Sequence, residues 1–298
     1  MIVCLGEALV DLICPRPVAS LAAADSFAPH FGGALANVAV AARRAGAEAG
    51  IAGAAGDDEW GRWLAERLER EGVDLRFFEL LSDAQTPVAF ATFDEQREPT
   101  FQIYGDAIEL AVASVAPRLD EAIAAATALV YSSTTLATHD EREVTLRARE
   151  LALARGAKVC FDPNIRPNRW GGDAGAAAEA SRELIAGSFL VRANRSEATA
   201  IAGVDDPRAA AEELAALGAE LAVVTLGAEG AVIRGACEAE APAPAVDVVS
   251  TLGAGDAFMG TLVAGLALHD WDPAAAADAL GPALDAAAAA CTRWAALG

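Results

Sequence analysis

The chain has 298 residues, of which 54% are hydrophobic and 22% charged, and it carries a formal net charge of −21. This length and apolar content predict an extensive hydrophobic core. The acidic excess argues against a nucleic-acid-binding protein, because a nucleic-acid surface needs concentrated positive charge. No uninterrupted apolar run is long enough to span a membrane, and Glu7 and Asp11 interrupt the apolar start of the chain. We therefore expect a cytoplasmic protein that binds neither nucleic acid nor a membrane.

The cysteines agree with this location. They are odd in number and scattered, and none forms a Cys-x-x-Cys pair: Cys4, Cys14, Cys160, Cys237 and Cys291. Buried free thiols in a reducing compartment are the expected state.

Short apolar runs alternate with amphipathic segments along most of the chain. The expected strands are 2–5, 49–54, 129–132, 158–162, 189–193, 221–226 and 230–234. The expected helices are 34–45, 60–71, one within 140–155, 174–186, 207–217, 254–268 and 274–296. This alternation predicts an α/β fold with a mostly parallel sheet covered by helices on both faces. Such sheets bind ligands beyond the carboxyl ends of the strands, where Asp162, Asn194 and Thr225 are expected.

Two segments break the alternation. Residues 11–31 and 85–104 contain short β-like runs, notably 88–93 and 100–104. They predict a two-part antiparallel flap whose apolar face packs on the rest of the protein. A flap over a reaction site has a chemical use, because it excludes water that would otherwise take part in the reaction.

The first polar pattern in the chain is a glycine pair, Gly32 and Gly33, followed by Asn37. Paired glycines let a ligand approach the backbone closely. The Asn37 amide offers both a donor and an acceptor, as binding of a polyol requires. The alternative is a loop followed by the start of a helix, with no ligand.

The second pattern pairs Asn194 with Glu197, which lie one turn apart and share a face if this segment is helical. An amide and a carboxylate on one face suit a water-rich magnesium site near phosphates. The alternative is a helix cap with a favourable glutamate in the first turn. In the third pattern, Thr225 ends an expected strand, and Gly227 and Gly230 form a turn over which a nucleotide could lie.

The most informative pattern is the glycine turn at 253–256, which is followed by an apolar helix. Gly253, Ala254 and Gly255 leave backbone N–H groups pointing into one small space, which favours an anion. Asp256 stands at the rim of that space, where a carboxylate can accept a proton. An anion hole beside a base is what phosphoryl transfer to a hydroxyl requires. The alternative is a tight turn without function. The turn lacks the Gly-Lys-Ser/Thr ending of a Walker loop.

In this order, these segments resemble the ribokinase-like sugar kinases of the PfkB family over nearly the whole chain. The motifs that carry the resemblance are GEALVD at 6–11, Gly-Gly-x-x-x-Asn at 32–37 and STLGAGD at 250–256. The resemblance implies one domain over residues 1–298, a three-layer α/β/α sandwich with a small β-sheet lid at about 12–31 and 85–105. In this family the lid often doubles as a homodimer interface.

The resemblance also implies roles for the polar patterns. Asp11 and Asn37 hold sugar hydroxyls, and Gly32 and Gly33 let the ring approach. Asp256 is the base, and the N–H groups of the 253–256 turn stabilise the transferring phosphoryl group of ATP. Mg²⁺ lies near Asn194 and Glu197 and is held through water. The nucleotide is lined by Thr225, Gly227 and Gly230.

The substrate is less sharply defined. Residues 161–166, followed by Trp170, are similar to a segment of fructokinases and 2-keto-3-deoxygluconate kinases. Arg166 in this segment could meet a substrate carboxylate or the transferring phosphate, or form a loop ion pair with Asp162. A sugar or sugar acid is the expected small-molecule partner. The resemblance implies a fructokinase-like activity first. The alternatives are a 2-keto-3-deoxygluconate kinase, a ribose or nucleoside kinase and, in a different class, a sugar-binding protein that has lost catalysis.

Two departures from the family pattern affect details of the site. Fructokinases usually carry a Tyr-Arg pair in the lid, whereas here Tyr104, a candidate substrate-binding residue, is followed by Gly105. The sequence leaves open whether Arg97 compensates. Ser250 replaces the family's usual aspartate before the 253–256 turn, which weakens the case for a bound potassium ion.

Overall fold

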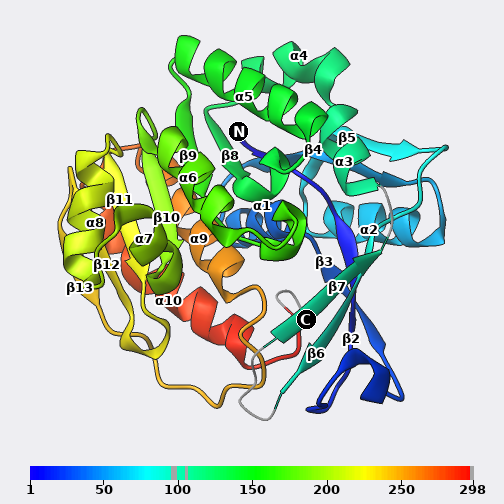
Figure 1. Ribbon diagram of the computed structural model, residues 1–298. Helices are drawn as coiled ribbons and strands as arrows, with labels where there is room; N and C mark the ends of the chain where they lie inside the picture. Colours follow the sequence, from blue (N-terminus) through cyan, green and yellow to red (C-terminus); the bar gives the residue numbers. More distant parts are fainter. Residues whose placement is uncertain (95–98, 105–106, 296–298) are drawn as a thin grey trace.

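The computed structural model of the chain describes residues 1–94, 99–104 and 107–295. Within these residues, a central sheet of nine strands has the order β13-β12-β11-β10-β9-β8-β1-β4-β5 (Figure 1). Strands β11 to β5 of this order pair in parallel, while β12 and β13 run antiparallel at one edge. The strands are β1 Ile2–Leu5, β4 Ala49–Gly56, β5 Asp74–Leu81, β8 Ala128–Ser132, β9 Lys158–Asp162, β10 Leu190–Asn194, β11 Leu221–Thr225, β12 Ala231–Gly235 and β13 Ala239–Ala241.

Helices cover both faces of this sheet. One hydrophobic core lies under α1 Ala34–Arg44, α2 Glu59–Arg70, α9 Ala254–Leu268 and α10 Ala275–Cys291. The other lies under α3 Ala107–Ala113, α4 Leu119–Ala124, α5 His139–Ala154, α6 Ala174–Ile185, α7 Arg195–Ala202 and α8 Pro207–Ala216. Short 3-10 turns occupy η1 Leu21–Ala23, η2 Ala116–Arg118, η3 Ser133–Leu136, η4 Pro167–Trp170 and η5 Gly227–Glu229. The three layers predicted from the alternation are therefore confirmed.

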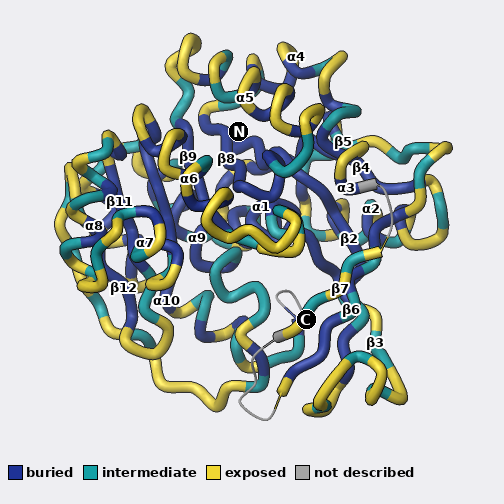
Figure 2. Tube along the Cα trace, in the orientation of Figure 1, coloured by how far each residue is buried: buried dark blue, intermediate teal, exposed yellow. Residues whose placement is uncertain are grey.

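The apolar runs of the sequence are strands buried on both faces (Figure 2). Successive side chains of a strand point to opposite faces. In β1, Cys4 joins the core under α1 and α9, while its neighbours Val3 and Leu5 join the opposite core. This two-sided burial explains why these strands read as continuous apolar segments.

Four further strands form the predicted lid, a separate sheet of order β3-β2-β6-β7 that projects from the main body (Figure 1). They are β2 Leu9–Ile13, β3 Ala28–Gly32, β6 Val88–Phe93 and β7 Pro99–Tyr104. The pairs β2–β3 and β6–β7 are antiparallel, as expected, but β2 and β6 are parallel. The chain leaves the lid after β3, passes through β4 and β5 of the main sheet and returns as β6, which runs in the same direction as β2. Each part of the predicted two-part flap is therefore antiparallel, and the two parts join through a parallel pair.

Several local expectations need correction. Strands β5 and β13 and helices α3, α4 and α7 were not predicted as elements, and α10 ends at Cys291, short of 296. The five cysteines are free, but Cys237 and Cys291 are only half-buried. Within the described residues, no helix combines the length and the apolar character that crossing a bilayer requires.

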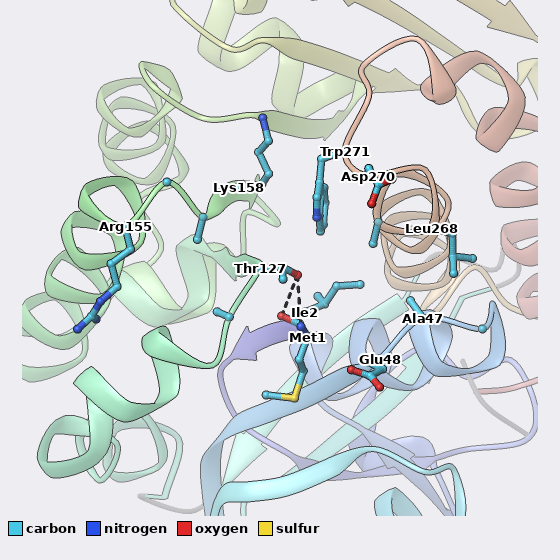
Figure 3. Close-up of a pocket in the computed structure, with 15 residues that line it drawn as sticks. Met1, Ile2, Ala47, Glu48, Thr127, Arg155, Lys158, Leu268, Asp270 and Trp271 are labelled. Carbon is cyan, nitrogen blue, oxygen red and sulfur yellow. Dashed lines mark hydrogen bonds between the residues drawn. The ribbon is translucent and has the colours of Figure 1, made fainter.

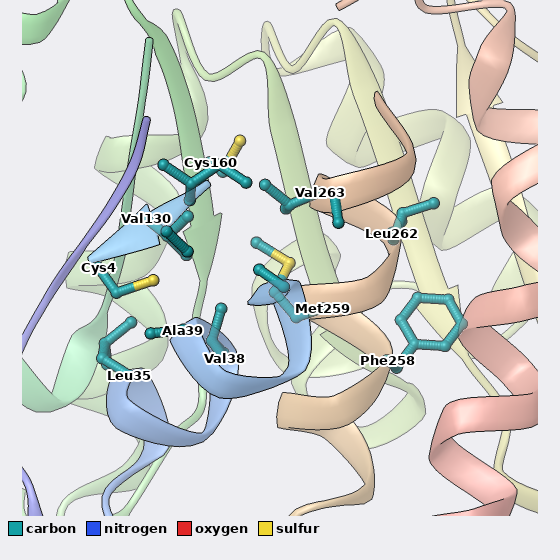
Figure 4. Packing of buried hydrophobic residues seen from close by; sticks show 14 of the residues in the cluster. Cys4, Leu35, Val38, Ala39, Val130, Cys160, Phe258, Met259, Leu262 and Val263 are labelled. Carbon is teal, nitrogen blue, oxygen red and sulfur yellow. The ribbon is translucent and has the colours of Figure 1, made fainter. Parts of the chain in front are cut away.

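Close packing of α1 on α9 positions the site. Figure 4 shows Val38 of α1 and Met259 and Val263 of α9 meeting above the sheet residues Cys4 and Cys160. A Cβ atom on Gly260 of α9 would lie 2.4 Å from the backbone oxygen of Val38, so only glycine permits this approach. The contact brings the amino-terminal turns of the two helices together, although more than 200 residues separate them in the chain, since Asn37 and Asp256 are 219 residues apart.

Candidate active site

The carboxyl edge of the parallel sheet collects the polar residues that the sequence placed at strand ends. Asp162, Asn194 and Thr225 are the last residues of β9, β10 and β11. These strands are parallel neighbours, so their ends meet at one edge. The predicted convergence of these three residues is confirmed.

The 253–256 turn forms the amino terminus of α9. Gly253 precedes the helix in the left-handed conformation, with φ of 76°, and no side chain caps the helix there. Among the described residues, the N–H groups of Gly253, Gly255 and Asp256 have no acceptor, whereas the N–H of Ala254 lies 3.3 Å from the Thr251 carbonyl oxygen. Three free N–H groups at the positive end of a helix make a ready site for an anion.

Asp256 lies against Asn37 at the rim of this turn. Asn37 Nδ2 donates a hydrogen bond of 2.9 Å to Asp256 Oδ2. Burial raises the pKa of Asp256, while the Asn37 hydrogen bond and the charges of Arg166 and Arg192 oppose that rise. Asn37 is 4% exposed, and its Oδ1 has no hydrogen-bond partner among the described residues. A buried acceptor of this kind needs a donor, which a ligand hydroxyl can supply.

Asp11 lies on lid strand β2, and its carboxyl group occupies the space next to Gly32. A Cβ atom on Gly32 would lie 2.3 Å from Asp11 Oδ2, so the glycine makes room for the carboxyl group. Burial and the nearby Asp256 raise the pKa of Asp11 to about 8, against the opposing charge of Arg166. The raised pKa favours the protonated form of Asp11, in which the carboxyl group can donate as well as accept a hydrogen bond.

The next residue, Gly33, is constrained by its backbone conformation and by the nearby backbone of Glu7. Its φ is +100°, and a Cβ atom there would lie 2.5 Å from the Glu7 backbone oxygen. Both features restrict the position to glycine. The glycine pair thus allows the lid strand β3 to pass directly into α1, which carries Asn37.

Glu7 is a site residue that the sequence analysis did not single out. It is 5% exposed, and its Oε2 has no partner among the described residues. Burial raises the pKa of Glu7 to about 6, against its own backbone N–H and the charge of Arg169, while Asp256 contributes to the rise. Its only signal was an acidic residue directly after an apolar strand. Glu7, Asp11 and Asp256 make the acceptor side of the site acidic.

The charge of Arg166 acts on these acids, and the alternative that Arg166 forms a loop ion pair with Asp162 is wrong. Asp162 pairs with Arg192, with 3.1 Å between Asp162 Oδ2 and Arg192 Nη1, and not with Arg166. The charge of Arg166 instead acts on Asp11 and Asp256 and lowers the pKa of each. Arg166 is half-buried, and Arg97, the other candidate arginine, lies outside the described residues.

Tyr104 is not brought to this side of the lid. In the register of the lid, Asp11 pairs with Ala89 and Ala89 with Ile103, while Tyr104 pairs with Val88. Because side chains alternate along a strand, Tyr104 and Asp11 lie on opposite faces. Tyr104 is 50% exposed and packs edge-on against Phe90, with ring centroids 5.5 Å apart. The structure therefore does not bring Tyr104 to the side of the lid on which Asp11 lies, where the sugar contact was predicted.

Asn194 and Glu197 form a capping box at the start of α7. Asn194 Oδ1 accepts from the Glu197 N–H, and Glu197 Oε2 accepts from the Asn194 N–H, each at 2.9 Å. Glu197 Oε1 accepts from the Ile165 N–H at 2.9 Å. Both carboxylate oxygens are thus held by backbone groups, which leaves their second lone pairs for water. The alternative of a helix cap is therefore what the structure shows at these two residues, and the second lone pairs are what they could offer to the water shell of Mg²⁺. Within the described residues, no group of three or more acidic, cysteine or histidine side chains suits direct binding of a metal.

The three candidate nucleotide residues differ in what constrains them. Thr225 Oγ1 accepts a hydrogen bond of 2.8 Å from Arg192 Nη2. A Cβ atom on Gly227 would meet nothing within 4 Å, so its surroundings are open to a ligand. A Cβ atom on Gly230 would lie 1.9 Å from the Ala241 backbone oxygen, so packing near β13 requires this glycine whether or not a nucleotide binds.

A cavity of about 620 Å³ lies at the opposite, amino edge of the sheet, where Lys158, Trp271 and Thr127 line it (Figure 3). None of the predicted site residues contributes to it. Lys158 lies over the Phe189 ring, 4.3 Å from its centroid, and so is already engaged. Ligands of parallel α/β sheets bind at the carboxyl edge, and the acids, the free N–H groups and Arg166 all gather there. We therefore assign the active site to that edge.

An anion site at a helix terminus with a carboxylate beside it, at the carboxyl edge of a parallel sheet, is the arrangement expected of an α/β phosphotransferase. The family model of the pfkB family carbohydrate kinases matches residues 1–296. The chain belongs to the pfkB family of carbohydrate kinases, whose members transfer a phosphoryl group to a hydroxyl.

Curated relatives include sugar and riboside kinases. The chain is 32% identical over 284 residues to the aminoimidazole riboside kinase of Salmonella typhimurium, a match that covers 93% of this chain and 84% of the relative. It is 33% identical over 273 residues to fructokinase-1 of Oryza sativa subsp. japonica, a match that covers 88% of this chain and 82% of the relative.

Solved structures show the same fold. A fructokinase double mutant from Vibrio cholerae with fructose, ADP and potassium superimposes with a TM-score of 0.85 at 28% identity, covering 99% of this chain and 93% of the other. The aminoimidazole riboside kinase of Salmonella enterica with its riboside and an ATP analogue gives 0.83 at 30% identity, covering 99% and 95%. ATP is accordingly the phosphoryl donor that the family relationship supports.

Proposed function

We propose that this protein phosphorylates a sugar hydroxyl from ATP, with Asp256 as the base. The hydroxyl oxygen attacks the γ-phosphorus, the bond from that phosphorus to the bridging β–γ oxygen breaks, and the hydroxyl proton passes to Asp256. The free N–H groups of the 253–256 turn stabilise the charge on the transferring group. The observation that carries this proposal is the contact between Asn37 Nδ2 and Asp256 Oδ2 at 2.9 Å, which joins a sugar-binding amide to the base.

The residues on the ATP side of the site come from the ends of β10 and β11 and from the loop after β9. Thr225 and Gly227 flank the space in which the nucleotide lies, and Arg166 is placed to offset negative charge near Asp256. Asn194 and Glu197 hold Mg²⁺ through water, and the metal when bound neutralises the ATP phosphates. Ser250 Oγ is already used, because it accepts a hydrogen bond from the Leu252 N–H. The residues at 250–252 therefore do not favour a potassium site.

The acceptor is a neutral sugar, and fructose is the first candidate. Glu7, Asp11 and Asp256 converge on the acceptor side, where a substrate carboxylate would meet three acidic groups. The charges of Arg166, Arg192 and Arg169 act on these acids and offset part of that cost. A polyol instead matches the unpartnered oxygens of Glu7 and Asn37. The several fructokinase relatives favour fructose, and the Salmonella relative makes a riboside the second candidate. A keto-deoxy sugar acid ranks behind the neutral sugars, because its carboxylate would add a fourth acidic group to Glu7, Asp11 and Asp256.

The test is ADP release from MgATP with fructose, ribose, a nucleoside, aminoimidazole riboside and 2-keto-3-deoxygluconate, each with and without potassium. We expect kcat/KM for one neutral acceptor to exceed that for the sugar acid by about 100-fold or more, which is about 2.7 kcal/mol of discrimination. Faster turnover of the sugar acid would reject the neutral-acceptor assignment. Binding of sugars and ATP without any turnover would favour the non-catalytic alternative.

We also propose a cytoplasmic homodimer that forms through the lid. Phe27, Phe90 and Tyr104 form a chain of edge-to-face rings on the lid face opposite Asp11, with centroids 5.0 and 5.5 Å apart. Half-exposed aromatic residues of this kind are common at protein interfaces. Sedimentation velocity should give a dimer for the wild type and a monomer for Phe90→Asp. A monomeric wild type at micromolar concentration would rule this interface out.

A further inference from the structure

Arg192 is a buried cation at the carboxyl edge of the sheet that the proposed reaction leaves without a role. It is the third residue of β10, and its side chain is 11% exposed. Its Nη1 donates to Asp162 Oδ2 at 3.1 Å, and its Nη2 donates to Thr225 Oγ1 at 2.8 Å. One guanidinium group therefore ties together the ends of β9, β10 and β11.

The same guanidinium group lies directly against the 253–256 turn. A Cβ atom on Gly255 would lie 2.6 Å from Arg192 Nη1, 2.8 Å from Nη2 and 2.9 Å from Cζ. The end of the Arg192 side chain therefore occupies the space next to Gly255 in which a side chain would lie. A side chain at position 255 would have to displace this buried guanidinium group from its hydrogen bonds to Asp162 and Thr225.

Three acidic side chains act on Arg192, one each from β9, α7 and α9. Burial lowers the pKa of Arg192, but Asp162 of β9, Glu197 of α7 and Asp256 of α9 together raise it, so the group stays charged. A cation beneath a helix amino terminus is opposed by the helix dipole, and these carboxylates offset that cost. Arg192 in turn lowers the pKa of Asp256, as Arg166 does from the loop after β9.

We propose that Arg192 is a positioning residue for phosphoryl transfer, because its guanidinium group packs against Gly255 and holds positive charge beside the turn that receives the phosphoryl group. Its action is indirect, through Gly255 and Asp256, and the inference rests on the proposed function of the turn and the base. A purely structural ion pair in the same place would affect stability and leave the chemical step unchanged.

Four variants test this inference. Arg192→Met removes the charge and keeps most of the length, and Arg192→Lys keeps a charge. Gly255→Ala forces the guanidinium group away while leaving it in the protein. The matched control is Arg234→Met on β12, whose side chain is 12% exposed and pairs with Glu240 and Glu212 away from the site.

We expect Arg192→Met and Gly255→Ala each to lower kcat by about 10- to 100-fold, below the loss from removing a direct oxyanion donor. The KM for the acceptor should change by less than about threefold, because Asp11 and Asn37 are untouched. The acid limb of the kcat–pH profile should move to higher pH in Arg192→Met, since Asp256 loses a neighbouring cation while the acids Glu7, Asp11 and Asp162 remain. Arg192→Lys should recover much of the rate, and Arg234→Met should match the wild type.

The outcomes separate this inference from the proposed function. If Asp256→Asn is inactive while folded Arg192→Met keeps the wild-type kcat and pH limb, the role of Arg192 is overturned and that of Asp256 stands. If Asp256→Asn stays active, the proposed base is wrong. If Arg192→Met fails to fold, as judged by circular dichroism, Gly255→Ala decides, because an unchanged kcat in that folded variant contradicts the inference.

Discussion

Replacing Asp256 by asparagine is expected to lower kcat by about 1,000-fold, within the range of a lost general base. The amide keeps the size and a hydrogen-bond acceptor for Asn37 Nδ2, but it cannot take the proton of the attacking hydroxyl. Burial already raises the pKa of Asp256, so the neutral side chain should not destabilise the fold. Nucleotide binding, measured by calorimetry with an ATP analogue, should stay close to that of the wild type.

The matched control is Asp278→Asn, an exposed acid in the first turn of α10. Both substitutions remove a carboxylate from the favourable end of a helix dipole, but only Asp256 lies at the site. Steady-state rates at saturating ATP and acceptor should therefore fall only in Asp256→Asn. A kcat within tenfold of the wild type, on the order of 1.4 kcal/mol, would exclude Asp256 as the base.

Replacing Gly33 by alanine should destabilise the protein strongly, with a loss of about 3 kcal/mol in the free energy of unfolding. Part of the cost arises because φ at this position is +100°, which side-chain-bearing residues rarely adopt. The rest arises because the new Cβ atom would lie 2.5 Å from the Glu7 backbone oxygen and 3.0 Å from the Ala8 Cα atom. Movement of α1 would also displace Asn37, so the KM for the acceptor should rise.

Gly203→Ala separates these two contributions. Gly203 also has a positive φ, +74°, but a Cβ atom there would meet nothing within 4 Å. Urea unfolding of this variant should show a loss of only about 1 kcal/mol, the backbone cost alone. Equal losses in the two variants would show that the close approach of Gly33 to Glu7 does not matter for stability.

The sequence by itself determined the layers of the fold and most of the polar groups at the reaction edge. Apolar runs and helix-ending glycines are local signals, so the elements that carry Asp162, Asn194 and Thr225 could be placed before any contact was known. The 253–256 turn was equally readable, because free N–H groups at the start of a helix depend on a few consecutive residues. Strand β13, only three residues long, and strand β5, which is only partly buried, had too weak a pattern to predict.

Only the tertiary structure decided how these groups meet. The contact of Asn37 with Asp256 and the packing of Arg192 on Gly255 join residues far apart in the chain. The face on which Tyr104 lies depends on strand register, because a shift of one residue reverses the direction of every side chain. Gly230 was expected to line a nucleotide, yet its nearest constraint is the backbone of Ala241. Long-range packing leaves no periodic signal in a sequence, and for that reason the partners of these residues could not be read from it.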